Sequence, residues 1–351
     1  MVDALLALLR SLIRTPSFSR EEGQTAQILA DFVQAQGYTP HRLHHNVWIT
    51  SRHFAPERPT LLLNSHHDTV KPVASWQRDP FAADIVDDKL YGLGSNDAGA
   101  SLVGLLGAFL ATEQAAAPLP FNLVWLASAE EEISGKNGIE AVLPQLGNIA
   151  AAIVGEPTQM QMAIAEKGLM VLDGEVLGKA GHAARYEGDN AIAKALPDVQ
   201  WLSEYRFPQA SPLLGEVKMS VTQIQAGSQH NVVPDRCTFV VDVRSNECYT
   251  NAELLAIIRQ HLQAAQVTPR SLRLNASHIP LAHPLVQRGL SLGLPYYGSP
   301  TLSDQALMPF HSLKIGIGDS ARSHTADEYV HLSEFQRGIA LYQNLLQGWC
   351  F

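Results

Sequence analysis

The chain has 351 residues, which is long enough for one large domain or two moderate domains with a substantial core. Hydrophobic residues make up 46 % of it and charged residues 17 %, proportions that are ordinary for a globular protein. The formal net charge is −9 and Lys and Arg form no run, so a nucleic-acid partner is not expected.

The cysteines and the N-terminal segment indicate the cellular compartment in which the protein is expected. Cys237, Cys248 and Cys350 include no C-x-x-C pair and give no disulfide framework, which fits a reducing environment. Asp3 precedes the apolar N-terminal segment and Arg10 interrupts it, so this segment predicts an amphipathic helix rather than a secretion signal. No apolar run approaches the roughly 20 residues that span a bilayer. We therefore expect a cytoplasmic protein that does not associate with membranes.

The first part of the chain alternates helices with short apolar strands. A second helix is predicted over Glu21–Gln36 and ends at Gly37. The next predicted elements are a strand over Thr60–Asn64, a helix over Asp97–Thr112, and strands over Phe121–Ala127 and Ala150–Val154. This alternation predicts an α/β fold in which helices flank a mixed, mostly parallel central sheet.

The pattern changes after residue 162. The predicted elements are strands over Leu169–Leu177, Val217–Gln225, Cys237–Val243 and Ser271–Asn275, and helices over Asn190–Tyr205 and Asn251–Gln263. Their order, β-α-β-β-α-β, is that of a ferredoxin-like α+β domain. We therefore expect this domain, residues 163–276, to be inserted into a first domain formed by residues 1–162 and 277–351.

Side chains of the types that bind metal ions in proteins follow the predicted strands of the first domain. In chain order they are His66, Asp97, Glu132, Glu156 and His324, and Glu131 precedes the third of them. Ligands of open α/β sheets bind beyond the carboxyl ends of the strands, where most of these residues are predicted to lie. Two imidazoles and three carboxylates suit a pair of Zn²⁺ or similar ions. The additional carboxylate of Glu131 is what metal-assisted hydrolysis needs to deprotonate a water molecule.

Each of these residues has an ordinary alternative when taken alone. His66 can belong to a polar loop after a strand, and Asp97 suits the cap of a helix. Glu130–Glu132 can form a solvated acidic turn, although three buried carboxylates would repel one another unless cations are near. Glu156 can lie in a structural turn and His324 on the surface. The combination of these residues, rather than any one of them, favours a metal site.

Taken in order, these segments resemble the M20 family of zinc peptidases and deacylases, which includes acetylornithine deacetylase and succinyl-diaminopimelate desuccinylase. The resemblance covers nearly the whole chain. It rests on the H-x-D triplet at 66–68, the Gly-x-Gly-x-x-Asp sequence at 92–97, the Glu-Glu pair at 131–132, and the sequences GEPT, GKAGHAARYEGDNAI, NVVPD, DVR and HTADE. These matches are specific for the superfamily and much less specific for the substrate.

The resemblance implies a dinuclear metal centre. One metal ion would be held by His66, Asp97 and Glu156, and the other by Asp97, Glu132 and His324, with Asp97 bridging the two. Zn²⁺ is the expected ion and Co²⁺ the alternative.

The same resemblance implies a metal-dependent hydrolase of linear amides. Glu131 would be the general base and later the proton donor to the leaving amine, and Asp68 would orient His66. The expected reaction is removal of the acyl group from an N-acyl amino acid, as in acetylornithine deacetylation for arginine biosynthesis. N-acetylcitrulline and N-succinylornithine are close variants. The alternatives are succinyl-diaminopimelate desuccinylation, dipeptidase or carboxypeptidase activity, and a catalytically silent protein that binds metal or an amino acid.

Residues of the inserted domain are implied to complete the site. His182 would stabilise the oxyanion, in cis or across a homodimer formed through this domain, while Asn231 and Arg244 would contact the substrate. The guanidinium of Arg244 matches a substrate carboxylate. Arg322, two residues before His324, is a candidate for an acyl carboxylate or for a surface salt bridge. Three nearby acids are expected to orient other groups or to lie on the surface: Asp319, Asp327 and Glu328.

Overall fold

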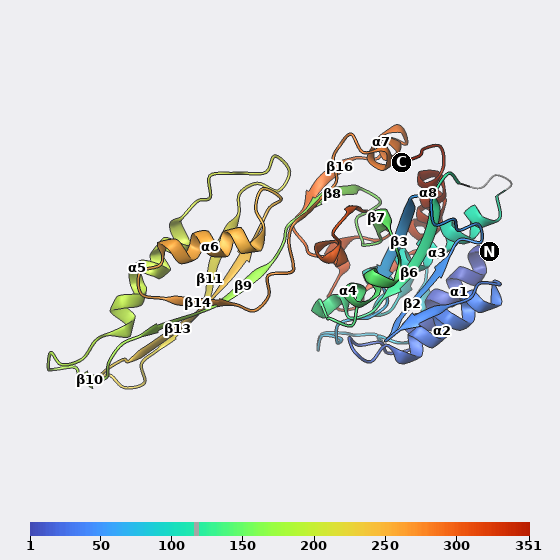
Figure 1. The fold of residues 1–351 in the computed structure, drawn as a ribbon. Helices are drawn as coiled ribbons and strands as arrows, with labels where there is room; N and C mark the ends of the chain where they lie inside the picture. Colours follow the sequence, from blue (N-terminus) through green and yellow to red (C-terminus); the bar gives the residue numbers. More distant parts are fainter. Residues whose placement is uncertain (116–118) are drawn as a thin grey trace. The chain divides into compact units, whose positions relative to one another are not determined.

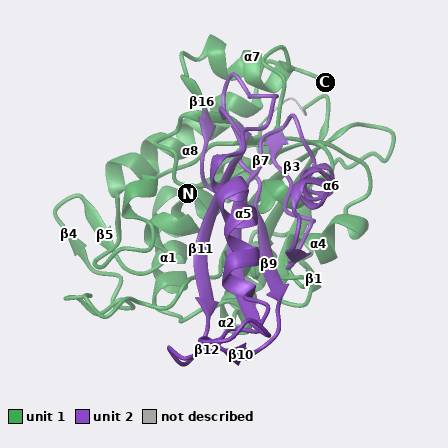
Figure 2. Ribbon diagram, turned by 90° about the vertical axis from the view of Figure 1, so that its left-hand side faces the viewer, with its two compact units in different colours: residues 1–164, 278–297, 303–351 green, residues 165–277, 298–302 purple. Residues whose placement is uncertain are grey.

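The computed structural model describes residues 1–115 and 119–351 (Figure 1). The chain forms two compact units, which Figure 2 distinguishes by colour. Unit 1 comprises Met1–Ile164, His278–Tyr297 and Ser303–Phe351, and unit 2 comprises Ala165–Ser277 and Gly298–Leu302. The candidate metal ligands therefore belong to unit 1, whereas His182, Asn231 and Arg244 belong to unit 2.

The main sheet has parallel strands at its centre. Its strands are β1 (His41–Leu43), β2 (Asn46–Thr50), β3 (Thr60–His66), β6 (Asn122–Ser128), β7 (Ile149–Val154), β8 (Met162–Glu166), β15 (Ser277–His278), β16 (Tyr296–Ser299) and β17 (His311–Lys314). Along β6-β3-β7-β17 all neighbours run parallel, and β1 and β2 add antiparallel strands beside β6. The chain passes from one unit to the other within β8, β15 and β16, and returns to unit 1 between Leu302 and Ser303. The predicted α/β fold with a mostly parallel central sheet is confirmed.

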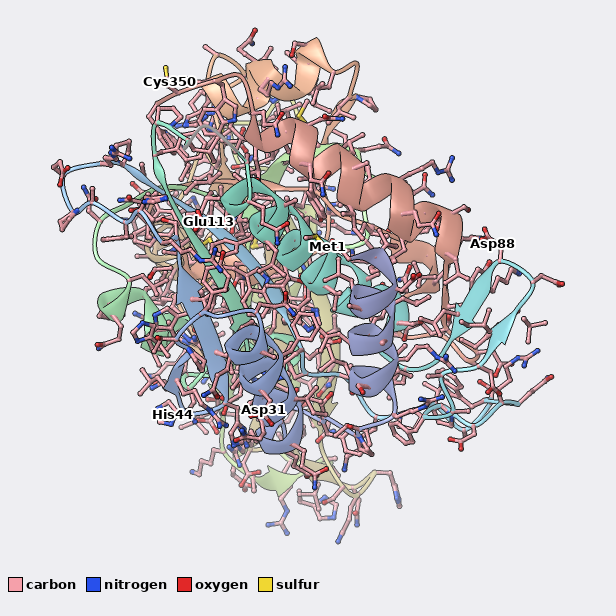
Figure 3. All side chains as sticks on the ribbon, turned by 90° about the vertical axis from the view of Figure 1, so that its right-hand side faces the viewer. Met1, Asp31, His44, Asp88, Glu113 and Cys350 are labelled. Carbon is pink, nitrogen blue, oxygen red and sulfur yellow. The ribbon has the colours of Figure 1, made fainter. Side chains whose placement is uncertain are left out.

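Helices cover both faces of this sheet. They are α1 (Val2–Ile13), α2 (Gly23–Ala35), α3 (Ala100–Glu113), α4 (Ile139–Val142), α7 (Pro284–Ser291) and α8 (Leu332–Leu346). Helices α1, α2, α3 and α8 lie on the face that is turned towards the viewer in Figure 3. On this face the indole N–H of Trp125 donates to the Leu102 carbonyl of α3 at 3.2 Å. On the opposite face, Leu62 packs with Ile139 and Val142 of α4. Because neighbouring residues of a strand point to opposite faces, these apolar strands supply both layers of the core.

A small antiparallel sheet joins two distant segments of unit 1. It has the order β18-β5-β4 and consists of β4 (Ile85–Val86), β5 (Lys89–Tyr91) and β18 (Tyr329–His331). The loop that carries Asp97 leaves β5, and the loop that carries His324 enters β18. In the part of the chain that the structure describes, no helix has the length and apolar character needed to cross a bilayer.

Unit 2 contains a four-stranded antiparallel sheet with two helices. Its elements are β9 (Met170–Leu177), β10 (Gly181–His182), α5 (Ala191–Glu204), β11 (Lys218–Ala226), β12 (Val232–Val233), β13 (Arg236–Arg244), α6 (Asn251–His261) and β14 (Gln266–Pro269). The sheet order is β11-β13-β9-β14, and β10 pairs separately with β12. Together with α5 and α6 this order gives the predicted ferredoxin-like arrangement.

The position predicted for the last strand of unit 2 is wrong. That strand was expected over 271–275, but β14 lies over Gln266–Pro269 and pairs with β9. The reason is the buried carboxylate of Asp198 in α5, which accepts the N–H groups of Gln263, Ala264 and Ala265 at 2.8, 2.9 and 2.7 Å. These hydrogen bonds turn the chain into the sheet soon after α6.

We expect Asp198→Ala to lower the free energy of unfolding of unit 2 by about 3 kcal/mol, because three main-chain N–H groups lose a charged acceptor. Urea unfolding followed by circular dichroism would measure the change. Asp173→Ala is the matched control, because its exposed ion pair with Arg270 contributes little in water. Equal effects of the two substitutions would contradict the role assigned to Asp198.

Candidate metal centre

Six of the predicted side chains come together at the carboxyl edge of the parallel strands in unit 1. They are His66, Asp97, Glu131, Glu132, Glu156 and His324. The Nε2 atom of His66 lies 3.3 Å from Asp97 Oδ1, and that of His324 lies 3.6 Å from Asp97 Oδ2. Asp97 thus presents one oxygen to each imidazole, which is the arrangement that a bridging ligand requires.

The remaining carboxylates divide between the two imidazoles. His66 Nε2 lies 3.8 Å from Glu156 Oε1 and 3.9 Å from Glu131 Oε2, whereas His324 Nε2 lies 2.9 Å from Glu132 Oε2. Proximity of ligand atoms also groups His66 with Glu131 and Glu156, and His66 with Asp97 and Glu132. Distance alone therefore does not separate Glu131, the expected base, from the expected ligands.

The donor atoms fit divalent cations. Glu156 Oε1 is buried and has no hydrogen-bond partner among the described residues, although it points at the imidazole of His66. An unpartnered buried carboxylate oxygen is expensive unless a cation is near. Imidazole nitrogens and carboxylate oxygens are the ligands of Zn²⁺ and of similar ions.

The electrostatics of the cluster also favour a cation. Burial raises the pKa of Glu131 and of Glu156 well above the usual value, and neighbouring carboxylates raise both further against the opposing effect of His66. Burial alone would lower the pKa of His66, but the surrounding acids, Glu131 first, outweigh it and hold this pKa well above normal. The hydrogen bond to Glu132 is the main reason that the pKa of His324 is raised to about 9. Carboxylates that repel one another at such a site bind cations readily.

The main-chain turn of Glu131 and Glu132 is held by Asp68. Its Oδ1 atom accepts the N–H of Glu131 at 3.0 Å, and its Oδ2 atom accepts the N–H of Glu132 at 3.2 Å and the Ser19 hydroxyl at 2.7 Å. His66 Nδ1 lies 2.9 Å from the carbonyl oxygen of Asp68 and 3.5 Å from its carboxylate. The nearer contact to Asp68 is therefore through its main chain, while its carboxylate fixes the acidic turn.

Two residues of the sequence motifs point away from the cluster. His67 uses both ring nitrogens elsewhere, with Nδ1 2.9 Å from the Thr25 hydroxyl and Nε2 3.0 Å from the His45 carbonyl oxygen. Glu130 has a φ angle of +55° and accepts a hydrogen bond from the Asn137 side chain at 3.0 Å. Of the three consecutive glutamates, the second and third face the site.

The sequence predicted that Asp97 lies in the first turn of a helix, and this prediction is wrong. Asp97 lies in an irregular turn over Ser95–Gly99 with φ −118° and ψ 95°, and α3 begins at Ala100. The N–H groups of Asn96 and Asp97 donate to Glu328 Oε1 at 2.8 and 2.9 Å. Because these N–H groups bind Glu328, the chain here leaves helical geometry.

Sequence reasoning missed the parts played by two buried acids. Asp304 accepts hydrogen bonds at Oδ2 from Asn64 at 2.8 Å and from Ser128 at 2.6 Å, and burial raises its pKa to about 6. It adds to the negative potential at Glu131, and no motif in the sequence points to it. Glu328 was expected only as an orienting or surface acid. It is 2 % exposed, and its place four residues after His324 was the available signal.

The residues predicted in unit 2 have local partners there. His182 is exposed on β10, which pairs with β12, and the N–H of Ala183 donates to the Asn231 carbonyl at 3.0 Å. Arg244 lies at the end of β13 and donates to both carboxylate oxygens of Asp242 at 2.8 and 3.0 Å. The roles of His182, Asn231 and Arg244 at a substrate stay predictions.

Arg322 of unit 1 is already paired. Its two terminal nitrogens donate to the two oxygens of Glu334 at 2.7 and 3.0 Å, and its guanidinium lies 4.7 Å from the centre of the Tyr329 ring. A carboxylate of a substrate would have to compete with Glu334 for the same edge of the guanidinium. The predicted substrate contact of Arg322 therefore gains no support, and the structure has the salt bridge instead.

Comparison with known proteins adds a family and a fold. The model of the peptidase family M20/M25/M40 matches residues 62–348. The chain is similar to a succinyl-diaminopimelate desuccinylase of Rhodospirillum centenum, with 26 % identity over 381 aligned positions that cover 98 % of this chain and 97 % of that protein.

Solved structures share the fold across nearly the whole chain. Aminopeptidase PepT from Bacillus cereus matches with a TM-score of 0.80 and 15 % identity, covering 99 % of this chain and 98 % of that one. A dinuclear metal-binding peptidase of the M20 family from Bacillus subtilis matches with a TM-score of 0.76 and 15 % identity, covering 98 % and 97 %. At such low identity these structures establish the fold alone.

We expect Co²⁺ or Zn²⁺ to stabilise chelator-treated protein, because cations relieve the repulsion among buried carboxylates. Free metal at 100 times its Kd should raise the free energy of unfolding by about 2.7 kcal/mol, which thermal unfolding would detect. His66→Ala should remove most of this effect, whereas His44→Ala, at an exposed position (Figure 3), should keep it. A metal effect of equal size in both variants would contradict the placement of the site.

Proposed function

Because the chain belongs to the peptidase family M20/M25/M40, we propose that it is a dinuclear metal hydrolase that cleaves the linear amide bond of an N-acyl amino acid. The observation that carries this proposal is the position of Asp97, whose two oxygens face two different imidazoles. Carboxylates that bridge two ions in this way occur in hydrolases whose metals stand about 3.5–4 Å apart.

The ligand sets follow from these distances and from the family. His66, Asp97 and Glu156 would hold one ion, and Asp97, Glu132 and His324 the other. Zn²⁺ is the proposed ion, with Co²⁺ as a substitute. When bound, such ions polarise an amide carbonyl and make a water molecule acidic near neutral pH.

Glu131 is the proposed acid and base. Its carboxylate lies 3.9 Å from His66 Nε2, at the cluster but not needed in either ligand set, and its N–H is fixed by Asp68. It takes a proton from the attacking water and delivers that proton to the amine that leaves. Burial raises the pKa of Glu131 in the metal-free cluster, and two bound cations would lower it again towards the range in which a carboxyl group can accept and return a proton.

Succinyl is the acyl group that we propose for the substrate. The curated relative is a succinyl-diaminopimelate desuccinylase, so the comparison supports this alternative better than acetylornithine deacetylation, which the sequence had favoured. Arg322 does not help to choose between them, because it is paired with Glu334. The small-molecule substrate would carry an amino-acid carboxylate in either case.

Unit 2 is proposed to complete the site. His182 is an exposed imidazole that can donate to an oxyanion, and Asn231 immediately precedes β12, where its carbonyl accepts the N–H of Ala183, the residue after His182. Arg244 is proposed to exchange Asp242 for a substrate carboxylate, since its planar guanidinium binds carboxylates at two points. We further propose a homodimer through unit 2, in which His182 acts in cis or in trans. A cytoplasmic location stays a prediction.

We expect Glu131→Gln to bind two ions per chain and to lose activity by about 10²–10⁴-fold, because the amide cannot take the proton of water. Metal analysis and single-turnover assays would measure both quantities. Glu130→Gln is the matched control, since the neighbouring glutamate binds Asn137 and should alter activity only a few-fold. A fully active Glu131→Gln would remove this residue from the mechanism.

The substrate proposal predicts the order of activities in a panel. Protein reconstituted with Zn²⁺ or Co²⁺ should show its highest kcat/KM with N-succinyl-diaminopimelate. The other members of the panel are N-succinylornithine, N-acetylornithine, N-acetylcitrulline and simple dipeptides. A preference for N-acetylornithine would contradict the proposed succinyl group but would leave the proposal of a metal-dependent amide hydrolase standing. If protein with two bound ions cleaves no amide of the panel, the result would favour the alternative of a catalytically silent protein that binds metal or an amino acid.

A further inference from the structure

The two loops that carry Asp97 and His324 meet beside the small sheet of unit 1. β18 pairs with β5 antiparallel, with Tyr329 opposite Tyr91. The next contact along this pair is the N–H of Gly92, which donates to the main-chain oxygen of Glu328 at 2.9 Å. This pairing places Glu328 next to the chain that runs from β5 to Asp97.

The Glu328 carboxylate binds three main-chain N–H groups of that loop. Oε1 accepts from Asn96 at 2.8 Å and from Asp97 at 2.9 Å, and Oε2 accepts from Gly94 at 3.2 Å. Glu328 is 2 % exposed, so water does not compete for these bonds. Hydrogen bonds from N–H groups to a carboxylate are about twice as strong as those between neutral groups. They set the main-chain direction at Asp97, where the chain departs from a helix.

Asn96 connects the same loop to the chain just before His324. Its Oδ1 atom accepts the N–H of Asp319 at 2.9 Å, and its Nδ2 atom donates to the Asp319 carbonyl at 3.1 Å and to the Ser323 hydroxyl at 3.4 Å. Gly318 permits this approach, because a Cβ atom there would lie 2.3 Å from Asn96 Oδ1. Asn96 and Glu328 thus join the two loops on both sides of His324.

We propose that Glu328 and Asn96 form a clamp that positions Asp97 against His324 and so sets the affinity for the second metal ion. This inference rests on the dinuclear site of the proposed function and assigns positioning residues to it. The sequence gave Glu328 only the general role of an orienting or surface acid, without naming the group that it orients, and gave Asn96 no role.

The clamp should act unequally on the two ions. His66 is the last residue of β3, and Glu156 follows β7 by two residues, so the parallel sheet itself positions two ligands of the first ion. His324 has a side chain that is 54 % exposed, and it lies in a loop rather than at the end of a strand. Its position relative to Asp97 therefore depends on the bonds made by Asn96 and Glu328.

The test is Co²⁺ titration of chelator-treated full-length protein, followed by calorimetry and by visible absorption. Glu328→Gln places an N–H₂ group against one of the three N–H donors, and Asn96→Asp removes the donor to Asp319 and Ser323. Each should raise the Kd of the second Co²⁺ ion by about 10–100-fold, the usual effect of losing a partner behind a ligand. The Kd of the first ion should change only a few-fold. Saturating Co²⁺ should restore kcat in both variants.

Asp327→Asn is the matched control. Asp327 adjoins Glu328, and its carboxylate likewise accepts two main-chain N–H groups, those of Gln77 and Arg78 at 3.1 and 2.9 Å. Among the described residues its carboxylate makes no hydrogen bond to the Asp97 loop, and its φ of +54° suits Asn. The Kd of both ions should be unchanged in this variant.

Three results would overturn the clamp: an unchanged second Kd in Glu328→Gln and Asn96→Asp, equal weakening of both ions, or an equal effect of Asp327→Asn. Circular dichroism of the metal-free variants checks their folding, and Asn96→Asp decides alone if Glu328→Gln does not fold. Wild-type protein that binds fewer than two ions would refute the dinuclear site and the clamp together. Wild-type protein that binds two ions but cleaves no amide of the panel would refute only the proposed function, since the Kd comparison stands without it.

Discussion

The structure of unit 1 depends on holding several carboxylates together against their mutual repulsion. Asp97, Glu131, Glu132 and Glu156 meet at one edge of the sheet around two imidazoles, where burial raises the pKa of the three glutamates. Such a cluster persists only where main-chain donors fix its members and cations offset its charge. The bridging position of Asp97 makes it the centre of this arrangement, because each of its oxygens serves a different imidazole.

Buried acids that bind consecutive main-chain N–H groups recur through the protein. Asp68 holds the turn of Glu131 and Glu132, Glu328 holds the loop of Asp97, and Asp198 holds the turn between α6 and β14. In each case one carboxylate from a distant segment replaces the hydrogen bonds that a helix or strand would have provided. At Asp68 and Glu328 these hydrogen bonds fix proposed metal ligands in irregular segments of the backbone, as the regular geometry of β3 and β7 fixes the ligands at the ends of those strands.

The substrate is harder to infer from the structure than the metal centre, because the candidate arginines already have partners. Arg244 and Arg322, the two candidates for binding a carboxylate, are each paired at two points with an acid of the same chain, Asp242 and Glu334. A substrate would have to displace these partners, so the free energy of recognition is a difference between two similar ion pairs. Among the described residues, by contrast, the buried Oε1 atom of Glu156 has no hydrogen-bond partner that a cation would have to displace.

The sequence by itself determined the α/β fold, the ferredoxin-like order of unit 2 and the residues at the ends of β3, β6 and β7. Those features are local, because apolar runs define the strands and the polar residues that follow them must lie at one edge of a parallel sheet. The tertiary structure alone decided the irregular turn at Asp97, the place of β14 and the parts played by Asp304 and Glu328. Glu328 and its donors are 231 to 234 residues apart, and Asp304 and Asn64 are 240 apart. No periodicity or local propensity records such contacts, because they form only when the folded chain brings distant segments together.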